Sequence, residues 1–344
     1  MGIPHFLCIP FPLLGHVNPL MQFSHVLARH GCKVTFLHTE FNHKGSNTNV
    51  EGSKIKVVTL PDGLENDDDR SDMLRVLLSI KRTMPSLLPK LIEDVNASDS
   101  ENNISSILVT TNMSWALEIG HRLGIKGALF SPTSATSLAS GILVQRLIDD
   151  GIIDSSGLPT RKQEIELSPG IPMIDTAQFP WRGVSKVWFT GIIKEMETIK
   201  AASSSLWQED TTCLQWLDQQ PTRSVVYVSF GSLAALESNQ FKELALALDL
   251  IDKPFLWVVR ANDNNIITSS YRKGKIVSWA PQKMILNHPA IACFVTHCGW
   301  NSTLEGVCGG VPFLCWPFNS DQFINKRYIC DVWKVGLEME KDEN

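Results

Sequence analysis

The chain has 344 residues, of which 43% are hydrophobic and 19% are charged, and its formal net charge is −5 at pH 7. This length suits two domains or one large one, and the apolar content is sufficient to bury substantial cores. Charges of both signs are scattered, so the sequence lacks the basic run of a nucleic-acid-binding protein, and no stretch approaches the ~18 consecutive apolar residues of a membrane span.

The N-terminus and the cysteines favour a cytosolic protein. The first residues lack a basic segment and are interrupted by three prolines, which argues against a signal peptide. The eight cysteines are irregularly spaced without a C-x-x-C pair, and most lie in apolar runs, as buried free thiols do. We therefore expect a reducing, cytoplasmic environment and no disulfide framework.

The N-terminal half alternates short β-branched runs with helical patterns. Apolar residues at helical spacing predict a helix from Pro19 to Arg29, ended by Gly31, and further helices over about 71–95 and 114–123. Such alternation is typical of a parallel sheet with helices on both faces. Strands are predicted at residues 6–9, 33–37, 56–60, 106–109 and 127–130.

The pattern weakens between residues 154 and 210, where Pro, Gly and Ser become frequent, and then resumes with an amphipathic helix at 239–250. We therefore predict an α/β protein of two facing, doubly wound Rossmann-like domains, with ligands at the carboxyl ends of the strands. The predicted domains are residues 1–202 and 222–344, joined by a linker at 203–221. Strands of the second domain are predicted at residues 225–230, 255–259, 275–277, 291–296 and 312–316.

The segment 279–322 places polar residues where a bound nucleotide would need them. After the buried strand 291–296, a turn begins at His297, and Asn301 and Ser302 open a helix that runs to about residue 307. The free N–H groups and the dipole at such a helix start favour an anion, and these three side chains add hydrogen-bond donors. The arrangement suits a pyrophosphate.

The segment is also compatible with two other interpretations. Ser302 and Glu305 have the spacing of a capping box, so the segment could be an ordinary helix start. A Rossmann-type oxidoreductase would share the alternating architecture, but the sequence has no G-x-G-x-x-G fingerprint and no P-loop lysine motif.

A second motif follows the first predicted strand. Residues 10–16, PFPLLGH, precede a helix for which Asn18 is a plausible cap and Pro19 the first helical residue. The dipole at a helix N-terminus favours the neutral form of a nearby histidine, which is the form that a general base needs. His16 is therefore a candidate base, although a lone histidine there is more often an ordinary loop residue.

The segment 279–322 resembles the signature box of the plant secondary-product glycosyltransferases, a UDP-dependent family with the GT-B fold. The 44 positions match without insertion or deletion, including W-A-P-Q, H-C-G-W-N-S, E-G and D-Q. The resemblance also covers the segment around His16. It implies an enzyme that uses a UDP-sugar donor and a small hydroxylated hydrophobic acceptor, without a metal ion or other cofactor. It implies no nucleic-acid partner and no stable membrane insertion.

The resemblance gives roles to the residues that would bind UDP. Trp279 would stack on the uracil, next to Ala280, and Gln282 would lie beside the same base. Glu305 would accept hydrogen bonds from the ribose hydroxyls. The phosphates would be held by four polar residues: Ser232, His297, Asn301 and Ser302.

The resemblance also gives roles around the sugar. Trp300, after Gly299 of the turn, would border the sugar, and Asp321 and Gln322 would bind its hydroxyls. Glutamine at the last position is the usual glucose-associated residue, so UDP-glucose is the predicted donor. His16 would take the proton of the acceptor hydroxyl in an inverting transfer. The acceptor would be bound by loops around 61–90, 131–150 and 172–195.

The chain departs from the family pattern in two ways. Alignment through residues 112–116, NMSWA, places Thr110 where the family has the aspartate that orients the base. Threonine can accept a hydrogen bond from imidazole but cannot offset the charge of imidazolium. The chain is also shorter than the family pattern: the comparison places gaps between residues 202 and 203 and near 265–271, and the family's final helices have no counterpart. These departures predict impaired activity or, alternatively, a nucleotide-sugar-binding relic.

Overall fold

The computed structural model describes residues 2–44, 55–167, 171–181, 212–232, 236–259 and 273–339. The chain divides into two compact units, one of residues 1–132 with 184–207 and the other of residues 133–183 with 208–344. The segment 133–183 is thus grouped with the C-terminal unit, whereas the sequence assigns it to a domain of residues 1–202. The boundary predicted at 202–203 and the two predicted gaps lie outside the described residues.

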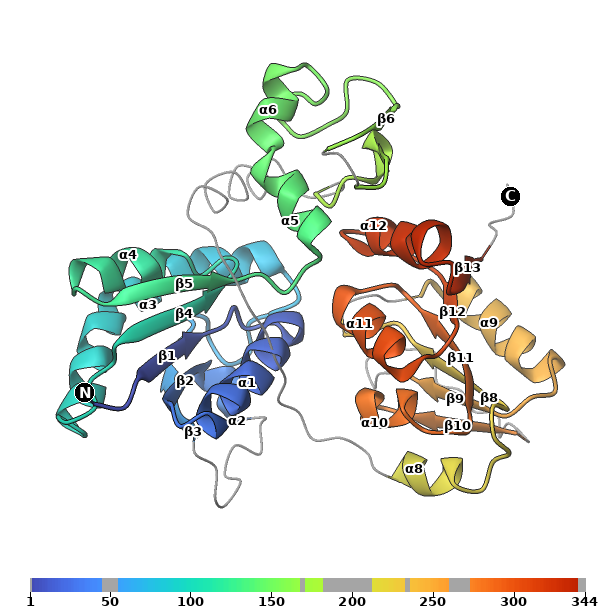
Figure 1. Ribbon diagram of the computed structural model, residues 1–344, viewed down its shortest axis with the longest axis horizontal. Helices are drawn as coiled ribbons and strands as arrows, with labels where there is room; N and C mark the ends of the chain where they lie inside the picture. Colours follow the sequence, from blue (N-terminus) through green and yellow to red (C-terminus); the bar gives the residue numbers. More distant parts are fainter. Residues whose placement is uncertain are drawn as a thin grey trace. The chain divides into compact units, whose positions relative to one another are not determined.

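The first unit contains a five-stranded sheet in the order β3-β2-β1-β4-β5 (Figure 1). All neighbouring strands are parallel. Each of the five strands predicted for this half is present within two residues of its expected bounds, because each is a short run of apolar and β-branched residues. The strands are β1 (His5–Ile9), β2 (Lys33–Thr39), β3 (Ile55–Leu60), β4 (Ser106–Thr110) and β5 (Lys126–Phe130).

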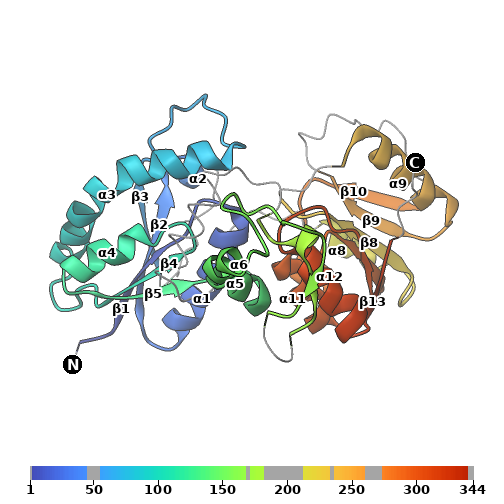
Figure 2. The ribbon, with the colours of Figure 1, turned by 90° about the horizontal axis from the view of Figure 1, so that it is seen from above.

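Helices cover both faces of this sheet (Figure 2). Helix α1 (Leu14–Arg29) packs on one face, while α3 (Met73–Ala97) and α4 (Trp115–Arg122) pack on the other. Successive β1 side chains alternate between the two cores, with Leu7 facing α3 and Cys8 facing α1. The short α2 (Glu40–Lys44) follows β2.

The predicted start of α1 is wrong. The helix begins five residues earlier, at Leu14, so Asn18 does not cap it and Pro19 lies inside it. The backbone N–H groups of His16 and Val17 both donate to the carbonyl of Leu13, which closes a first turn ahead of the proline. The lack of an N–H group on Pro19 destabilises the helix little, because the carbonyl to which this N–H would donate lies in the partly exposed first turn.

The second unit contains a six-stranded sheet, also fully parallel, in the order β10-β9-β8-β11-β12-β13. The five strands predicted for this half are present. The edge strand β13 was not predicted, because three residues with two exposed positions carry no readable pattern. The strands are β8 (Val225–Ser229), β9 (Phe255–Val258), β10 (Gly274–Val277), β11 (Ile291–Thr296), β12 (Phe313–Cys315) and β13 (Gly336–Glu338).

Helices again cover both faces of this sheet. Helix α9 (Ser238–Leu250) packs on one face, and α8 (Thr212–Leu217), α10 (Gln282–Leu286) and α11 (Trp300–Gly309) pack on the other (Figure 1). Helix α12 (Gln322–Arg327) continues into one π-helical turn, Tyr328–Val332.

The segment grouped with this unit joins α12 through two polar contacts. Its elements are α5 (Ala135–Ile142), α6 (Val144–Asp149), the two-residue strands β6 (Glu164–Ile165) and β7 (Ile174–Asp175), and a 3₁₀ turn at Thr176–Gln178. Thr136 Oγ1 lies 2.6 Å from the hydroxyl of Tyr328, and Glu164 forms an ion pair with Arg327 at 2.6 Å.

Both sheets have a topological switch point at their centre. The strand order reverses between β1 and β4 in the first unit and between β8 and β11 in the second. Loops that leave adjacent strands at such a point diverge and leave a crevice for ligands. The segments after β1 and β11 are those that carry His16 and His297. Within the described ranges, we find no helix that combines the length and apolar character needed to cross a membrane.

Candidate functional site

His16 lies in the first turn of α1, directly after the loop that leaves β1. Its Nδ1 is 3.0 Å from Oγ1 of Thr110, the last residue of β4. The ring of Phe11 packs edge-on against the imidazole, with 5.6 Å between ring centroids. Burial lowers the pKa of His16 to about 4. The imidazole is therefore neutral at physiological pH, as a general base requires.

Thr110 is fully buried, and its hydroxyl group has three neighbours. The backbone N–H of Phe11 donates to Oγ1 over 2.7 Å, and the hydroxyl donates to the carbonyl of Thr111 over 3.4 Å. A hydroxyl oxygen can accept two hydrogen bonds while donating one. The second acceptor position is thus left for Nδ1–H of His16. In that tautomer Nε2 is the basic nitrogen of His16.

Helix α11 begins at Trp300, with Gly299 at the N-cap position and no side-chain cap. The capping box considered for Ser302 and Glu305 does not form. Ser302 lies inside the first turn, where its hydroxyl accepts a hydrogen bond from Gln282 Nε2 over 2.9 Å. Because no side chain caps the helix, the N–H groups of its first turn are left for an anion. The half-buried Asn301 lies in the same turn.

His297 is enclosed by two glycines. A Cβ atom on Gly299 would lie 2.4 Å from His297 Nε2, and one on Gly231 would lie 2.6 Å from the same atom. Gly231 also has a φ of +69°, a conformation that favours glycine. The close approach brings the loop after β8, which carries Ser232, beside the loop after β11. The two predicted phosphate-binding loops therefore meet at one edge of the sheet.

The predicted base and ribose residues form one hydrogen-bonded network. Gln282 Nε2 donates to Glu305 Oε2 over 2.8 Å as well as to Ser302. The hydroxyl of Tyr227 on β8 donates to Gln282 Oε1 over 3.2 Å, which fixes the orientation of the amide. Burial raises the pKa of Glu305, and the hydrogen bond from Gln282 opposes this shift. Just before α10, Trp279 is half-buried and Ala280 is buried.

Tyr227 belongs to this network but was not predicted from the sequence. It is buried and stacks on Phe294, with 5.0 Å between ring centroids. The available signal was a tyrosine within an otherwise apolar strand, since a buried phenol needs a hydrogen-bond partner.

The residues predicted to bind the sugar lie at the start of α12. Asp321 occupies the N-cap position without a capping hydrogen bond, and burial raises its pKa to about 6. Gln322 is buried, and its Oε1 accepts the backbone N–H groups of Phe318 and Asn319 over 2.8 and 3.1 Å. In this structure the Gln322 amide therefore shapes its own loop. Trp300, predicted to border the sugar, is half-buried.

The residues predicted to bind the donor thus come from the loops after β8 and β11 and from the starts of α10, α11 and α12. His16 belongs to the other unit. In the described part of the chain, no group of three or more His, Cys, Asp or Glu side chains could hold a metal ion.

The loop after β3, part of the region predicted to bind the acceptor, is held from inside by Arg70. Its guanidinium binds both carboxylate oxygens of Asp62, over 2.8 and 3.1 Å, and stacks 3.8 Å from the centre of the Phe41 ring. The same group donates to three backbone carbonyls of the loop, those of Leu64, Glu65 and Asp68.

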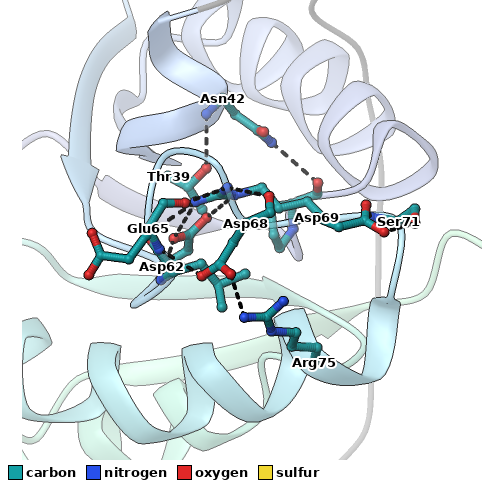
Figure 3. Close-up of polar contacts among 11 residues, drawn as sticks. Thr39, Asn42, Asp62, Glu65, Asp68, Asp69, Ser71 and Arg75 are labelled. Carbon is teal, nitrogen blue, oxygen red and sulfur yellow. Dashed lines mark hydrogen bonds and ion pairs between the residues drawn. The ribbon is translucent and has the colours of Figure 1, made fainter. Parts of the chain in front are cut away.

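An ion pair ties this loop to α3, and Asn42 of the neighbouring α2 contacts the loop before α1 (Figure 3). Asp68 forms an ion pair with Arg75 of α3. The amide of Asn42 donates to the carbonyl of Pro12 over 3.2 Å, and its backbone N–H donates to Thr39 Oγ1. The loop that precedes His16 and the loop after β3 are therefore supported by contacts from the same edge of the sheet.

Comparison with known proteins identifies the family of the chain. Residues 192–341 match the family described as UDP-glucoronosyl and UDP-glucosyl transferase. UDP-glycosyltransferase 83A1 of Arabidopsis thaliana is 38% identical, over 99% of this chain and 85% of the relative. The (R)-mandelonitrile beta-glucosyltransferase of Prunus dulcis is 30% identical, over 98% of this chain and 85% of the relative. The alignment with 83A1 spans 397 positions, so that relative has internal residues without a counterpart among the 344 here.

Solved structures have the same fold. Os79 from O. sativa in complex with UDP gives a TM-score of 0.80 at 22% identity, covering 98% of this chain and 87% of that one. Phytolacca americana UGT2 complexed with UDP-2fluoro-glucose and pterostilbene gives 0.78 at 22% identity, covering 100% and 86%. The fold is thus GT-B, with two Rossmann-like domains. Together with the identities to 83A1 and the mandelonitrile enzyme, this shows that the chain belongs to the plant UDP-glycosyltransferase family.

Proposed function

We propose that this transferase moves glucose from UDP-glucose to a hydroxyl group of a small hydrophobic acceptor, with inversion at the anomeric carbon. The observation that carries the proposal is the network of Gln282, Ser302 and Glu305 at the start of α11, beside the glycine-enclosed His297. This network joins the residues expected to meet the base, the ribose and the phosphates. Glucose is supported by the glutamine at position 322 and by the glucosyl transfer named for the Prunus dulcis relative.

In the proposed reaction, Nε2 of His16 accepts the proton of the acceptor hydroxyl while its oxygen attacks the anomeric carbon. The bond between that carbon and the β-phosphate oxygen breaks, and UDP leaves with the bonding electron pair. The N–H groups at the start of α11 stabilise the charge that develops on the leaving phosphate. Thr110 keeps His16 in the tautomer with a basic Nε2, but it supplies no negative charge to the imidazolium that forms.

A second candidate function is nucleotide-sugar binding without turnover. The specific observation in its favour is that the group that contacts Nδ1 of His16 is the neutral hydroxyl of Thr110. The residues of the donor network would be retained in such a protein. We also propose a cytosolic location, which is supported by eight cysteines that all carry free thiols.

The test combines turnover and binding. The purified chain is incubated with UDP-glucose and a panel of phenolic, terpenoid and cyanohydrin alcohols, and release of UDP is measured. UDP-galactose, UDP-xylose and UDP-glucuronic acid replace the donor in parallel. We expect the fastest release with UDP-glucose and none from the His16→Ala variant. UDP binding without release by any acceptor would favour the second candidate function.

Binding of UDP is measured separately by calorimetry. Trp279→Ala should weaken UDP binding about 10-fold or more, because stacking on a base contributes roughly 1–3 kcal/mol. Trp333→Ala, which alters a partly exposed tryptophan of the same unit, is the matched control and should leave the affinity unchanged. Absence of UDP binding by the folded wild-type protein would overturn the donor-site assignment.

A further inference from the structure

Asn325 connects two parts of the donor site that are far apart in the chain. It lies on the second turn of α12 and is completely buried. Its Nδ2 donates to the backbone carbonyl of Cys298 over 3.0 Å and to Asp321 Oδ2 over 2.9 Å. One amide group therefore contacts both the turn before α11 and the carboxylate expected to bind the sugar.

The contact with Cys298 supports an unusual backbone. Cys298 is fully buried and has a φ of +65°, in the left-handed region that side chains other than glycine rarely adopt. Such a conformation persists only when its surroundings hold it. The Asn325 amide satisfies the buried carbonyl of this residue. This turn directly follows His297 and leads to the N-cap of α11, so its shape sets where the phosphate-binding N–H groups lie.

The orientation of the Asn325 amide is determined by its neighbours. Its Oδ1 is buried and has no hydrogen-bond partner within the described ranges. Exchanging the nitrogen and oxygen positions would place that oxygen against a carbonyl oxygen and a carboxylate oxygen, which is repulsive. The amide accordingly directs both N–H groups to these acceptors, although one buried oxygen is left unsatisfied. An unsatisfied buried atom at this point indicates that the two donated bonds have a specific role.

We propose that Asn325 is a positioning residue of the transferase: its amide holds the turn at Cys298 and the carboxylate of Asp321 in one geometry, so that the phosphates and the sugar of the donor are bound as a unit. This inference rests on the proposed function. Asn325 acts through Asp321 and through the turn, and it lies outside the segment 279–322 that resembles the family signature.

The ionisation of Asp321 gives the inference a measurable signature. Burial raises the pKa of Asp321 to about 6, and the hydrogen bond from Asn325 opposes that rise, with a smaller contribution from a backbone N–H. No charged side chain in the described ranges contributes to this shift. Asn325 therefore helps to keep the carboxylate ionised near neutral pH, where it can accept hydrogen bonds from sugar hydroxyls.

The first test is Asn325→Ala, studied for turnover with UDP-glucose between pH 5 and 9. We expect kcat to fall about 10-fold with little change in the KM of the acceptor. The pH below which kcat declines should rise by about one unit, since a hydrogen bond to a charged group is worth roughly one pKa unit or more. Affinity for UDP-glucose should fall more than affinity for UDP, because the sugar contact is lost together with the alignment of the turn.

The second test is Asn325→Asp, which keeps the size of the side chain and removes the donors. At pH 8 we expect kcat to fall further than in Asn325→Ala, because the new carboxylate would repel both Asp321 and the Cys298 carbonyl. Turnover of this variant should then rise as the pH is lowered toward 6, because the protonated carboxyl can donate again. A purely structural role would not reverse the direction of the pH dependence. Asn325→Ser, which keeps one hydrogen-bond donor, replaces the alanine variant if that variant does not fold. The pH below which its kcat declines should rise, but by less than in Asn325→Ala.

Asn287→Ala is the matched control, because Asn287 is an exposed asparagine of the same unit whose amide donates to a helix carbonyl, that of Lys283. It should leave the pH profile and both affinities unchanged. The inference is overturned if the wild-type enzyme is active and the Asn325 variants keep its pH profile and its ratio of UDP-glucose to UDP affinity. If the wild-type protein itself neither binds UDP nor turns over, the proposed function has failed instead.

Discussion

Nδ1 of His16 and Oγ1 of Thr110 lie 3.0 Å apart, across the switch point between β1 and β4. The contact joins a half-buried, neutral imidazole to a hydroxyl that also accepts the N–H of Phe11. The contact can fix the tautomer of His16, the proposed base. It cannot stabilise the imidazolium that the proposed proton transfer forms, because a hydroxyl carries no charge. In a catalytic triad, one carboxylate both fixes the tautomer of the histidine and stabilises the imidazolium; the Thr110 hydroxyl can do only the first.

Thr110→Asp should raise kcat with UDP-glucose by about 10-fold or more, since loss of the carboxylate in a comparable triad lowers kcat by up to ~10⁴. Thr110→Val should lower kcat by a similar factor, because Nδ1 of His16 and the N–H of Phe11 would both lose their acceptor. Thr110→Ser keeps the hydroxyl and serves as the control. If kcat of Thr110→Asp equals that of the wild type in a folded protein, the missing charge does not limit the reaction.

The ionisation and tautomer of His16 can be observed directly by NMR of the imidazole nitrogens, assigned by comparison with His16→Ala. We expect Nδ1 to carry the proton at pH 7 and the ring to titrate with a pKa of about 4, well below the ordinary value near 6.5, because burial disfavours the charged form. A ring that titrates near 6.5, or that carries its proton on Nε2, would contradict the assignment of Nε2 as the base.

Gly299→Ala should weaken UDP binding by about 10-fold and lower the melting temperature, because the added Cβ would lie 2.4 Å from His297 Nε2. The backbone at Gly299 has a φ of −59°, which alanine accepts, so the clash alone is tested. The His297→Ala/Gly299→Ala double variant should melt at a higher temperature than Gly299→Ala, because the clash is relieved. If the decreases in stability of the two single variants simply add up in the double variant, the two side chains do not clash.

His38→Leu should stabilise the protein, and more so at acidic pH. His38 is 2% exposed, packs 5.6 Å from the Phe36 ring centroid, and has no hydrogen-bond partner for either ring nitrogen in the described ranges. Removing such unpaired groups should increase the unfolding free energy by roughly 1 kcal/mol at pH 7.

The pH dependence follows from the pKa of His38, which burial lowers to about 4. Between pH 6.5 and pH 4 the unfolded state binds more protons at this histidine than the folded state, so its contribution to stability falls as the pH is lowered. The advantage of the leucine variant should therefore grow by on the order of 2–3 kcal/mol toward pH 4. Urea denaturation at pH 5 and pH 7 measures this, with the exposed His121→Leu as control. An advantage that does not change with pH would refute the assignment.

Most of the fold could be predicted because its strands are short apolar runs whose pattern does not depend on distant residues. The starts of helices were less predictable. The sequence placed Pro19 at the first position of α1, but a turn closed on Leu13 extends the helix toward β1. The short helices α10 and α12 were missed, since six or fewer residues provide too little periodicity.

Residues of the candidate site could be predicted where they are close together in the sequence. They could not be predicted where their contacts join residues that are distant in the sequence. Through a family resemblance, the segment 279–322 indicated the residues that we propose to bind the donor. Tyr227 and Asn325 remained hidden because their partners lie 55 and 27 positions away. The capping box considered at Ser302 does not form because the helix begins at Trp300 with Gly299 at the N-cap, which places Ser302 inside the first turn.

The loop after β3 belongs to the region predicted to bind the acceptor, and the way in which Arg70 holds it determines which of its positions can change. The guanidinium is anchored by Asp62, and at Leu64 and Glu65 it meets main-chain oxygens, which every residue type possesses. Substitutions at those two positions can therefore change the chemistry displayed by the loop while its path is preserved. Substitutions in a loop held in this way can alter which small molecules it contacts while the backbone conformation is kept.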